Sequence, residues 1–375
     1  MKIFGVIDED PFATATWSGS SRYFFGALRD ADLLSGAIAC EPDRLSALLG
    51  KLRNVQSRKS SWRFSYHIDP AMSELRSRIV MKTLRSMTPQ YDVLLQVGAW
   101  YKLWNRVDRP VVSYHDGNLA ARIASPLGVP KVSSRRLTRG LEFERSVYSG
   151  HAAIFTMSNW LAESFVKDFG MPREKVHAVY AGINMPEPLT KSPGTYQAPN
   201  IVFVGKDFPR KGGEVLLSAF AKVRRQIRDA TLTLVGPQLE NPPEGVVCAG
   251  FVSKATPEGI RKVSEMYRAA SLFVLPSLYE PFGIAFCEAM AHGLPCIGTR
   301  ICAMPEIIDE GQTGILVPPR DAEALAAAML NLLTDERARE QMGAAGRARY
   351  ESMFTWSKVA SRIETTLRPL VSSAA

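Results

Sequence analysis

The sequence predicts an α/β protein of two domains, each built on a parallel sheet. The chain has 375 residues, about two and a half times the ~150 residues of an ordinary domain. Short apolar runs alternate along it with amphipathic segments, a pattern typical of strand–helix–strand units. A stretch rich in Pro, Ser and Thr at residues 185–200 separates two such series. We therefore predict one domain over 1–185, a second over 186–353, and a terminal helical segment over 354–375.

The first domain opens with a strand, a turn of small residues and a helix. Residues 2–7 are apolar and are followed by acidic residues, which predicts a buried strand. Ser18, Gly19 and Ser20 form a short turn, and the apolar residues after it have helical spacing. Further strands are predicted at residues 91–97, 111–114 and 152–156.

The same alternation restarts after residue 200. Strands are predicted at residues 201–205, 231–236, 272–276 and 295–298, and helices at 213–225, 283–291, 322–333 and 354–367. In open parallel sheets, ligands bind at the carboxyl ends of the strands, beside helix N-termini. The residues that follow the strands of the second domain are therefore the first candidates for a site.

The charge, cysteine content and hydropathy of the chain limit its expected compartment and its class of binding partner. The chain has 46 Lys and Arg against 37 Asp and Glu, a surplus of +9 that is too dilute to indicate nucleic-acid binding. The five cysteines include no C-x-x-C pair, which favours reduced, scattered thiols. No apolar stretch approaches the ~18 residues that span a bilayer, and Asp8 comes too early for a signal peptide. We expect a cytoplasmic protein whose membrane contact, if any, is peripheral and on the inner face.

The strongest local signal is the segment 272–298. Its strand ends at a loop in which Pro281 and Gly283 leave backbone N–H groups free at a helix start, where an anion such as phosphate is favoured. Glu280 lies on that loop, and Glu288 follows eight residues later inside an apolar helix. Two such carboxylates can accept hydrogen bonds from sugar hydroxyls on either side of a diphosphate. Solvent-facing carboxylates are the alternative, but Glu288 has apolar neighbours and needs a partner.

Residues 205–213 form a second basic loop after a strand. Lys206 and Lys211 are point charges that can neutralise a diphosphate leaving group. Arg210 lies between them in the sequence and is a weaker candidate for neutralising the diphosphate. A solvated basic turn is the alternative, which the position at a strand's carboxyl end disfavours.

Glu280 and Glu288 match the E-x7-E motif of retaining glycosyltransferases with the GT-B fold, and the chain resembles their large family-4, or group 1, branch. The resemblance runs from about residue 200 to 367 and includes the segments 204–213 and 311–326. It implies two Rossmann-like domains facing across a cleft, with the C-terminal helix crossing back to the N-terminal domain. It also implies hexosyl transfer from a nucleoside-diphosphate sugar to an acceptor hydroxyl, with retention, in polysaccharide or glycolipid biosynthesis.

The resemblance assigns roles in the second domain. Glu280 would hold the donor sugar's hydroxyls and Glu288 the ribose, while Phe282, Gly283 and Ile284 would line the donor. The two lysines would stabilise the leaving diphosphate. Because no Asp-x-Asp signature lies in a plausible nucleotide site, we expect neither a metal nor a cofactor, and the nucleotide sugar is a co-substrate.

The resemblance also assigns roles in the first domain and shows one departure. His115, after a predicted strand, would orient the reacting sugar, and Gly19 would approach the diphosphate. Where the family usually has a Gly-Gly pair before Pro305 and Glu306, this chain has Cys302 and Ala303. That departure leaves the identity of the donor sugar open.

Several alternatives stay open. Residues 51–85 hold nine basic and two acidic residues, which suits a solvated face, an anionic membrane lipid or an anionic acceptor, with nucleic acid disfavoured. The acceptor can be a glycan, a lipid-linked sugar or a small molecule, and the donor base is unspecified. A sugar-nucleotide epimerase or phosphorylase of the same fold is one alternative function. A non-catalytic basic protein that binds membrane or nucleic acid is another.

Overall fold

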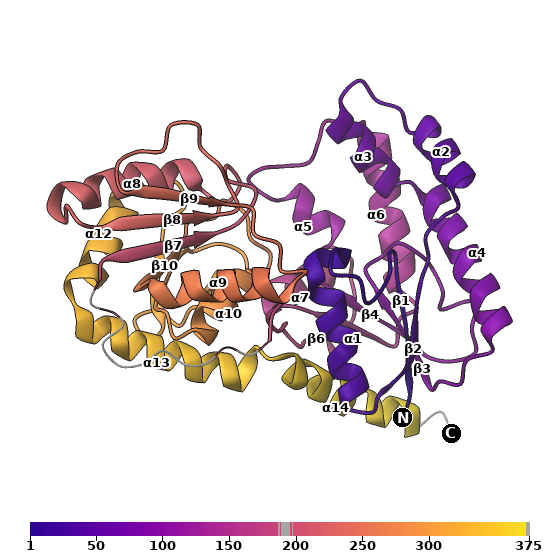
Figure 1. Cartoon of the computed structure of the whole chain (residues 1–375). Helices are drawn as coiled ribbons and strands as arrows, with labels where there is room; N and C mark the ends of the chain where they lie inside the picture. Colours follow the sequence, from indigo (N-terminus) through magenta and orange to yellow (C-terminus); the bar gives the residue numbers. More distant parts are fainter. Residues whose placement is uncertain (187, 189–195, 197, 373–375) are drawn as a thin grey trace. The chain divides into compact units, whose positions relative to one another are not determined.

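The computed structural model divides into two compact units, Met1–Tyr180 with Ser357–Ala375, and Ala181–Trp356 (Figure 1). It describes residues 1–186, 188, 196 and 198–372. Most of the linker predicted at 185–200 lies outside the described residues. Among the described helices, none is both long and apolar enough to cross a bilayer.

The N-terminal unit contains a six-stranded parallel sheet. Its strand order is β2-β1-β3-β4-β5-β6. The strands are β1 (Ile3–Ile7), β2 (Leu34–Ala39), β3 (Val93–Val97), β4 (Val111–His115), β5 (Ala153–Thr156) and β6 (Val176–Ala178). The helices are α1 (Ser20–Asp30), α2 (Arg44–Arg53), α3 (Lys59–His67), α4 (Pro70–Met87), α5 (Leu119–Ile123), α6 (Ser134–Tyr148) and α7 (Asn159–Lys167), with short 3-10 turns at Thr16–Gly19 and Arg173–Lys175. Strands β2 and β6 were not predicted, since neither has a long apolar run.

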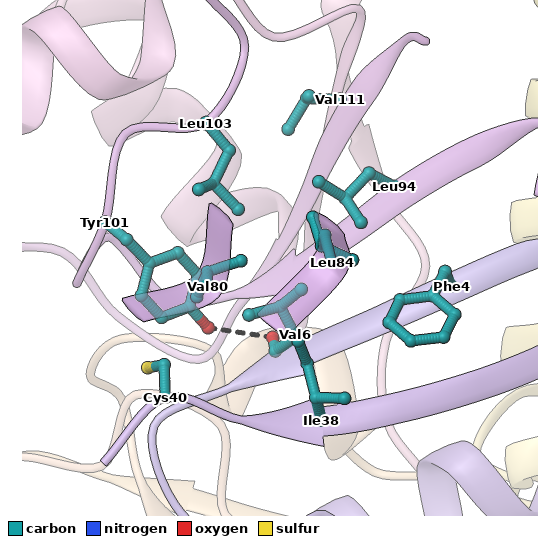
Figure 2. Packing of buried hydrophobic residues seen from close by; sticks show 10 residues of the cluster. All are labelled: Phe4, Val6, Ile38, Cys40, Val80, Leu84, Leu94, Tyr101, Leu103 and Val111. Atoms are coloured by element: carbon teal, nitrogen blue, oxygen red, sulfur yellow. Dashed lines mark hydrogen bonds between the residues drawn. The ribbon is translucent and has the colours of Figure 1, made fainter. Parts of the chain in front are cut away.

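Helices cover both faces of this sheet, because successive strand residues point to opposite faces. Phe4 and Val6 of β1 pack with Val80 of α4 in one buried cluster. Figure 2 shows this cluster, in which the hydroxyl of Tyr101 donates to the carbonyl of Val6 at 2.8 Å. On the other face, a Cβ on Gly5 would lie 2.4 Å from the ring of Phe25 in α1. The two-sided burial predicted from the apolar strands is therefore present.

The last helix, α14 (Trp356–Ser372), belongs almost wholly to the N-terminal unit. The guanidinium of Arg362 donates to the carbonyl of Val179 at 3.1 Å and lies over the ring of Tyr180. Ile363 and Leu367 are fully buried. This packing is the return of the terminal helix to the first domain that the resemblance implied.

The C-terminal unit contains a second parallel sheet, of order β12-β11-β10-β7-β8-β9. Its strands are β7 (Asn200–Val204), β8 (Thr231–Val235), β9 (Val246–Gly250), β10 (Leu272–Leu275), β11 (Cys296–Thr299) and β12 (Gly314–Val317). Its helices are α8 (Gly213–Gln226), α9 (Pro257–Ala269), α10 (Ile284–Ala291), α11 (Met304–Ile307), α12 (Ala322–Thr334) and α13 (Glu336–Met353). Strand order reverses between β7 and β10, so the loops after these two strands flank the point where open α/β sheets bind ligands.

Close packing holds these two loops together. Phe273 of β10 contacts Tyr267 of α9 and Phe286 of α10, so both helices cover one face of the sheet. Gly212, the N-cap of α8, has φ +72°, and a Cβ there would lie 1.9 Å from the carbonyl oxygen of Pro276. Only glycine fits this backbone without strain, which brings the loops after β7 and β10 within side-chain reach.

Candidate functional site

The loops after β7 and β10 join Lys211 to Glu280. The ammonium of Lys211 donates to Glu280 Oε2 at 2.7 Å, and the side chains are 12% and 11% exposed. Ser277 donates to the same oxygen at 3.1 Å, and the guanidinium of Arg210 lies 3.5 Å from it. Glu280 is therefore a buried carboxylate held by three side chains, and the solvent-facing alternative does not apply to it.

Opposing influences act on the pKa of Glu280. Burial raises it, but the charges of Lys211 and Arg210 and the hydrogen bonds from Lys211 and Ser277 together outweigh burial. The pKa of Glu280 is consequently below its ordinary value of 4.5. Glu280 is thus ionised at neutral pH and can accept hydrogen bonds from hydroxyl groups.

Lys206 carries the less compensated charge of the two predicted lysines. It is exposed, and its ammonium lies 3.7 Å from the centroid of the Phe251 ring, a cation–π contact. Within the described part of the chain, no carboxylate lies within ion-pair distance of it, whereas Lys211 shares its charge with Glu280. Lys206 therefore offers a positive charge to an anion at the end of β7.

Gly283 begins α10 with a left-handed backbone. It is the N-cap of the helix, with φ +86°, and a Cβ there would lie 2.7 Å from the terminal methyl of Met304. The first N–H groups of any helix lack an intrahelical acceptor, and here they belong to the half-buried residues Ile284 and Ala285. Phe282 is buried beside them, with its ring 6.1 Å from that of Phe354. This helix start offers N–H donors to an anion.

Glu288 has the partners that its apolar surroundings require. It is 1% exposed, forms an ion pair with Lys254, and accepts a hydrogen bond from the Tyr267 hydroxyl at 3.1 Å. The ring of Tyr267 stacks on that of His292, which ends α10. Lys254 and Tyr267 were not predicted, because no motif marks them. The only available signal was that a carboxylate in an apolar helix requires a donor from elsewhere.

Cys302 shows why glycine is usual at its position. Its φ is +46°, in the left-handed region where a side chain costs about 1 kcal/mol relative to glycine. Burial raises the pKa of its thiol, the Glu280 carboxylate raises it further, and a hydrogen bond with the Glu280 backbone lowers it. The departure therefore places a neutral thiol next to Glu280. Ala303, which is buried, has a φ of −80° and therefore lies outside the left-handed region.

In the N-terminal unit, the turn before α1 is left-handed over three residues. Trp17, Ser18 and Gly19 have φ values of 47°, 56° and 90°, so Gly19 is the one residue of the three suited to its backbone. The indole of Trp17 donates to Asp116 Oδ2 at 2.8 Å. This bond joins the loop after β1 to the loop after β4, and Trp17 was not among the predicted residues.

His115 ends β4 and is only 2% exposed. Its ring lies 5.3 Å from that of Tyr148 and 4.9 Å from that of Phe165. Burial and the nearby His151 hold its pKa well below 6.5, so the ring is neutral. Among the described residues, its Nε2 has no hydrogen-bond partner. The structure therefore places His115 in an aromatic cluster, and its predicted contact with a sugar stays a prediction.

Comparison with known proteins identifies the class. Residues 198–335 match the model of the family glycosyl transferases group 1. The sucrose-phosphate synthase of Thermosynechococcus elongatus superposes with a TM-score of 0.71 at 19% identity, over 100% of both chains. Anabaena Alr3699/HepE in complex with UDP superposes with a TM-score of 0.67 at 17% identity, over 98% of this chain and 100% of that one. The chain therefore has the GT-B fold.

The residues that match the glycosyl transferases group 1 model all lie in the C-terminal unit. The MMP alpha-(1->4)-mannosyltransferase of Mycolicibacterium hassiacum is 30% identical over 234 residues, which cover 61% of this chain and 56% of that protein. The chain spans only about half the length of the curated relatives that it matches. The residues that match the family model include Lys206, Lys211, Glu280 and Glu288, since all four lie within 198–335.

Proposed function

We propose that this protein transfers a glycosyl group from a nucleoside-diphosphate sugar to an acceptor hydroxyl, with retention of anomeric configuration. The observation that carries the proposal is the ion pair of Lys211 with Glu280 at the point where strand order reverses. It lies in a unit of the glycosyl transferases group 1 family whose other predicted cation, Lys206, is exposed. Retention comes from the resemblance alone.

The diphosphate is the part of the donor that the C-terminal unit suits best. When the bond from the sugar carbon to the diphosphate oxygen breaks, negative charge builds on the β-phosphate. Lys206, Lys211 and the N–H groups at the start of α10 then stabilise that charge. These groups supply the positive charge that a divalent cation supplies elsewhere. We propose that the reaction needs no metal and no cofactor besides the nucleotide sugar.

The carboxylates suit the two sugars of the donor. Glu280 would accept hydrogen bonds from the hydroxyls of the transferred sugar, and Glu288 from those of the ribose. Because Lys254 and Tyr267 already bind Glu288, they fix its orientation. For His115 and Gly19 we keep the roles that the resemblance implies, orientation of the reacting sugar and approach to the diphosphate.

We propose a hexose donor on the basis of the names of the similar proteins. The M. hassiacum relative is called a mannosyltransferase, and Alr3699/HepE was crystallised with UDP. Guanosine and uridine donors are therefore the first to test. The acceptor can be a glycan, a lipid-linked sugar or a small molecule, in a cytoplasmic step of polysaccharide or glycolipid biosynthesis. Peripheral contact with anionic membrane is part of this proposal.

The test is release of nucleoside diphosphate from a panel of GDP- and UDP-sugars. We expect turnover with at least one donor and a loss of about a hundredfold or more in Glu280→Gln, because that carboxylate contacts the donor. Glu240→Gln, an exposed glutamate in the same unit, is the matched control and should turn over normally. Interconversion of sugars without diphosphate release would indicate the epimerase. Diphosphate binding without turnover of any donor would indicate a binding protein.

A further inference from the structure

Helix α2 presents an apolar face to solvent. Leu45, Leu48, Leu49 and Leu52 are 66%, 52%, 57% and 58% exposed. Their spacing of three, four and seven residues places them on one side of the helix. Val55, just beyond the helix, is 57% exposed. A face of this kind usually points into the core, and a contiguous exposed apolar patch marks an interaction surface.

The leucines cannot turn inward, because the opposite face of α2 is already packed. Gly50 is buried, and a Cβ there would lie 2.2 Å from the sulfur of Met72 in α4 and 2.9 Å from the ring of Tyr66 in α3. Both helix ends are fixed as well. Asp43 caps the first turn at 3.0 Å, and the buried Asn54 donates to the Gly50 carbonyl at 3.0 Å.

Basic side chains lie on α2 and on the segment that follows it. Residues 44–63 contain six basic and no acidic residues, and all six are exposed: Arg44, Lys51, Arg53, Arg58, Lys59 and Arg63. At 100° per residue, Arg44 and Lys51 flank one side of the leucine face and Arg53 the other. Of the six, only Arg53 has a described carboxylate within ion-pair distance, Asp69 at 3.3 Å.

This surface differs from the basic segment predicted at 51–85. Arg76, in the middle of that segment, is 6% exposed, and its guanidinium lies over the rings of Tyr66 and Trp100. Arg76 therefore supports the fold of the N-terminal unit and cannot reach a partner. The α2 surface, made of the four leucines, Val55 and the six basic residues, combines exposed charge with exposed apolar area.

We propose that the α2 surface docks on an anionic phospholipid bilayer. The leucines and Val55 would enter the boundary between headgroups and acyl chains, and the basic residues would contact the headgroups. A second copy of the chain is disfavoured, because two such surfaces would bring six basic residues against six. A soluble anionic glycan or a nucleic acid would leave the leucines in water. This docking rests on the membrane contact of the proposed function and names the surface that makes it. It needs no nucleotide sugar, so it can be tested apart from the transfer reaction.

The test is flotation of the full-length protein with vesicles, without any nucleotide sugar. We expect it to float with equimolar phosphatidylcholine and phosphatidylglycerol, to stay at the bottom with phosphatidylcholine alone, and to lose binding as salt rises. The triple variant Leu45→Gln, Leu48→Gln, Leu52→Gln should lose flotation, because three apolar contacts disappear. Each of Lys51→Gln, Arg58→Gln and Lys59→Gln should weaken binding about fivefold. Val247→Gln, at an apolar residue of β9 that is 56% exposed, is the control and should float normally.

Circular dichroism of the triple variant shows whether it keeps its fold, and the three charge variants test the proposal without touching a leucine. Equal flotation with both lipid compositions, no flotation, or full flotation of the folded triple variant would overturn the proposal. A dimer that the leucine substitutions dissociate would replace the bilayer with a second copy. Failure of flotation would remove the proposed membrane contact but leave diphosphate release from sugar nucleotides unaffected, so docking and glycosyl transfer fail separately.

Discussion

Gly212 and Pro276 approach so closely that a Cβ on the glycine would lie 1.9 Å from the proline carbonyl oxygen. Gly212 directly follows Lys211, and Pro276 lies four residues before Glu280. The contact therefore fixes the backbone beneath the ion pair. It makes the geometry of the candidate site depend on a residue that bears no functional group.

Substitution of this glycine should destabilise the protein. Gly212→Ala combines a left-handed backbone, worth about 1 kcal/mol, with an overlap worth about 1–3 kcal/mol more. We expect a fall of about 2–4 kcal/mol in the free energy of unfolding by urea. Gly311→Ala is the control, since Gly311 has φ +75° but no atom within 4 Å of its Cβ position. This variant should lose only the ~1 kcal/mol that comes from the left-handed backbone. Equal losses in the two variants would contradict the role of the contact.

The two lysines should respond differently to substitution. Lys206 is exposed and has no described carboxylate partner, so Lys206→Ala should weaken nucleoside-diphosphate binding about tenfold. It should lower the melting temperature only slightly, because it removes only the exposed cation–π contact with Phe251. Lys211→Met should weaken binding and also lower the melting temperature, because it leaves Glu280 buried without its ammonium partner. Calorimetric titration and thermal melts of both variants check this. If both variants showed the same losses of nucleoside-diphosphate binding and of melting temperature, the ion pair of Lys211 with Glu280 would not distinguish the two lysines.

Removal of the cation beside Glu288 should weaken the C-terminal unit. Lys254→Met leaves a carboxylate that is 1% exposed with the Tyr267 hydroxyl as its remaining described side-chain partner, at a cost of about 1–3 kcal/mol. The measurement is the urea midpoint. Lys262→Met, at an exposed lysine of α9, is the matched control and should unfold like the parent. A parent-like midpoint for Lys254→Met would mean that Glu288 does not depend on its ion pair.

The ionisation of Glu280 predicts an acid dependence of stability. Its pKa in the folded protein is below the ordinary 4.5, so its stabilising contribution is fully present above pH 4.5 and is lost as pH falls through the folded pKa. The difference in melting temperature between the parent and Glu280→Gln should be constant above pH 4.5 and shrink below it. A melting-temperature difference that grows on acidification would mean that folding raises the pKa of Glu280, which would contradict the prediction.

Most of the sheet framework could be predicted from the sequence, because buried parallel strands are apolar runs. Residues 272–276 and 111–114 are such runs, and strands lie there. Strand β2, with the sequence LSGAIA, and strand β9, with VVCAG, are partly exposed and interrupted by small residues. Periodicity therefore gave no signal for them. Helix α2 was missed for a related reason, since its only buried residue is Gly50 and no apolar stripe faces the core.

The candidate site could be predicted where the spacing of residues along the sequence indicates their chemistry. Glu280, Glu288 and Lys211 were predicted from a carboxylate spacing and a basic loop after a strand. The structure pairs Lys211 with Glu280, and the roles of all three stay predictions. Lys254 and Tyr267 come from a loop and a helix with no motif, so only the folded chain brings them to Glu288. The orientation of His115 was equally inaccessible, because a strand end does not determine which face the last side chain takes.

The most direct test of the central claim is a crystal structure of the full chain grown with GDP or UDP. The account predicts the diphosphate at the start of α10, accepting from the N–H groups near Gly283 and within reach of the ammonium groups of Lys206 and Lys211, with the ribose hydroxyls toward Glu288. A diphosphate bound away from α10 and from both lysines would contradict the account.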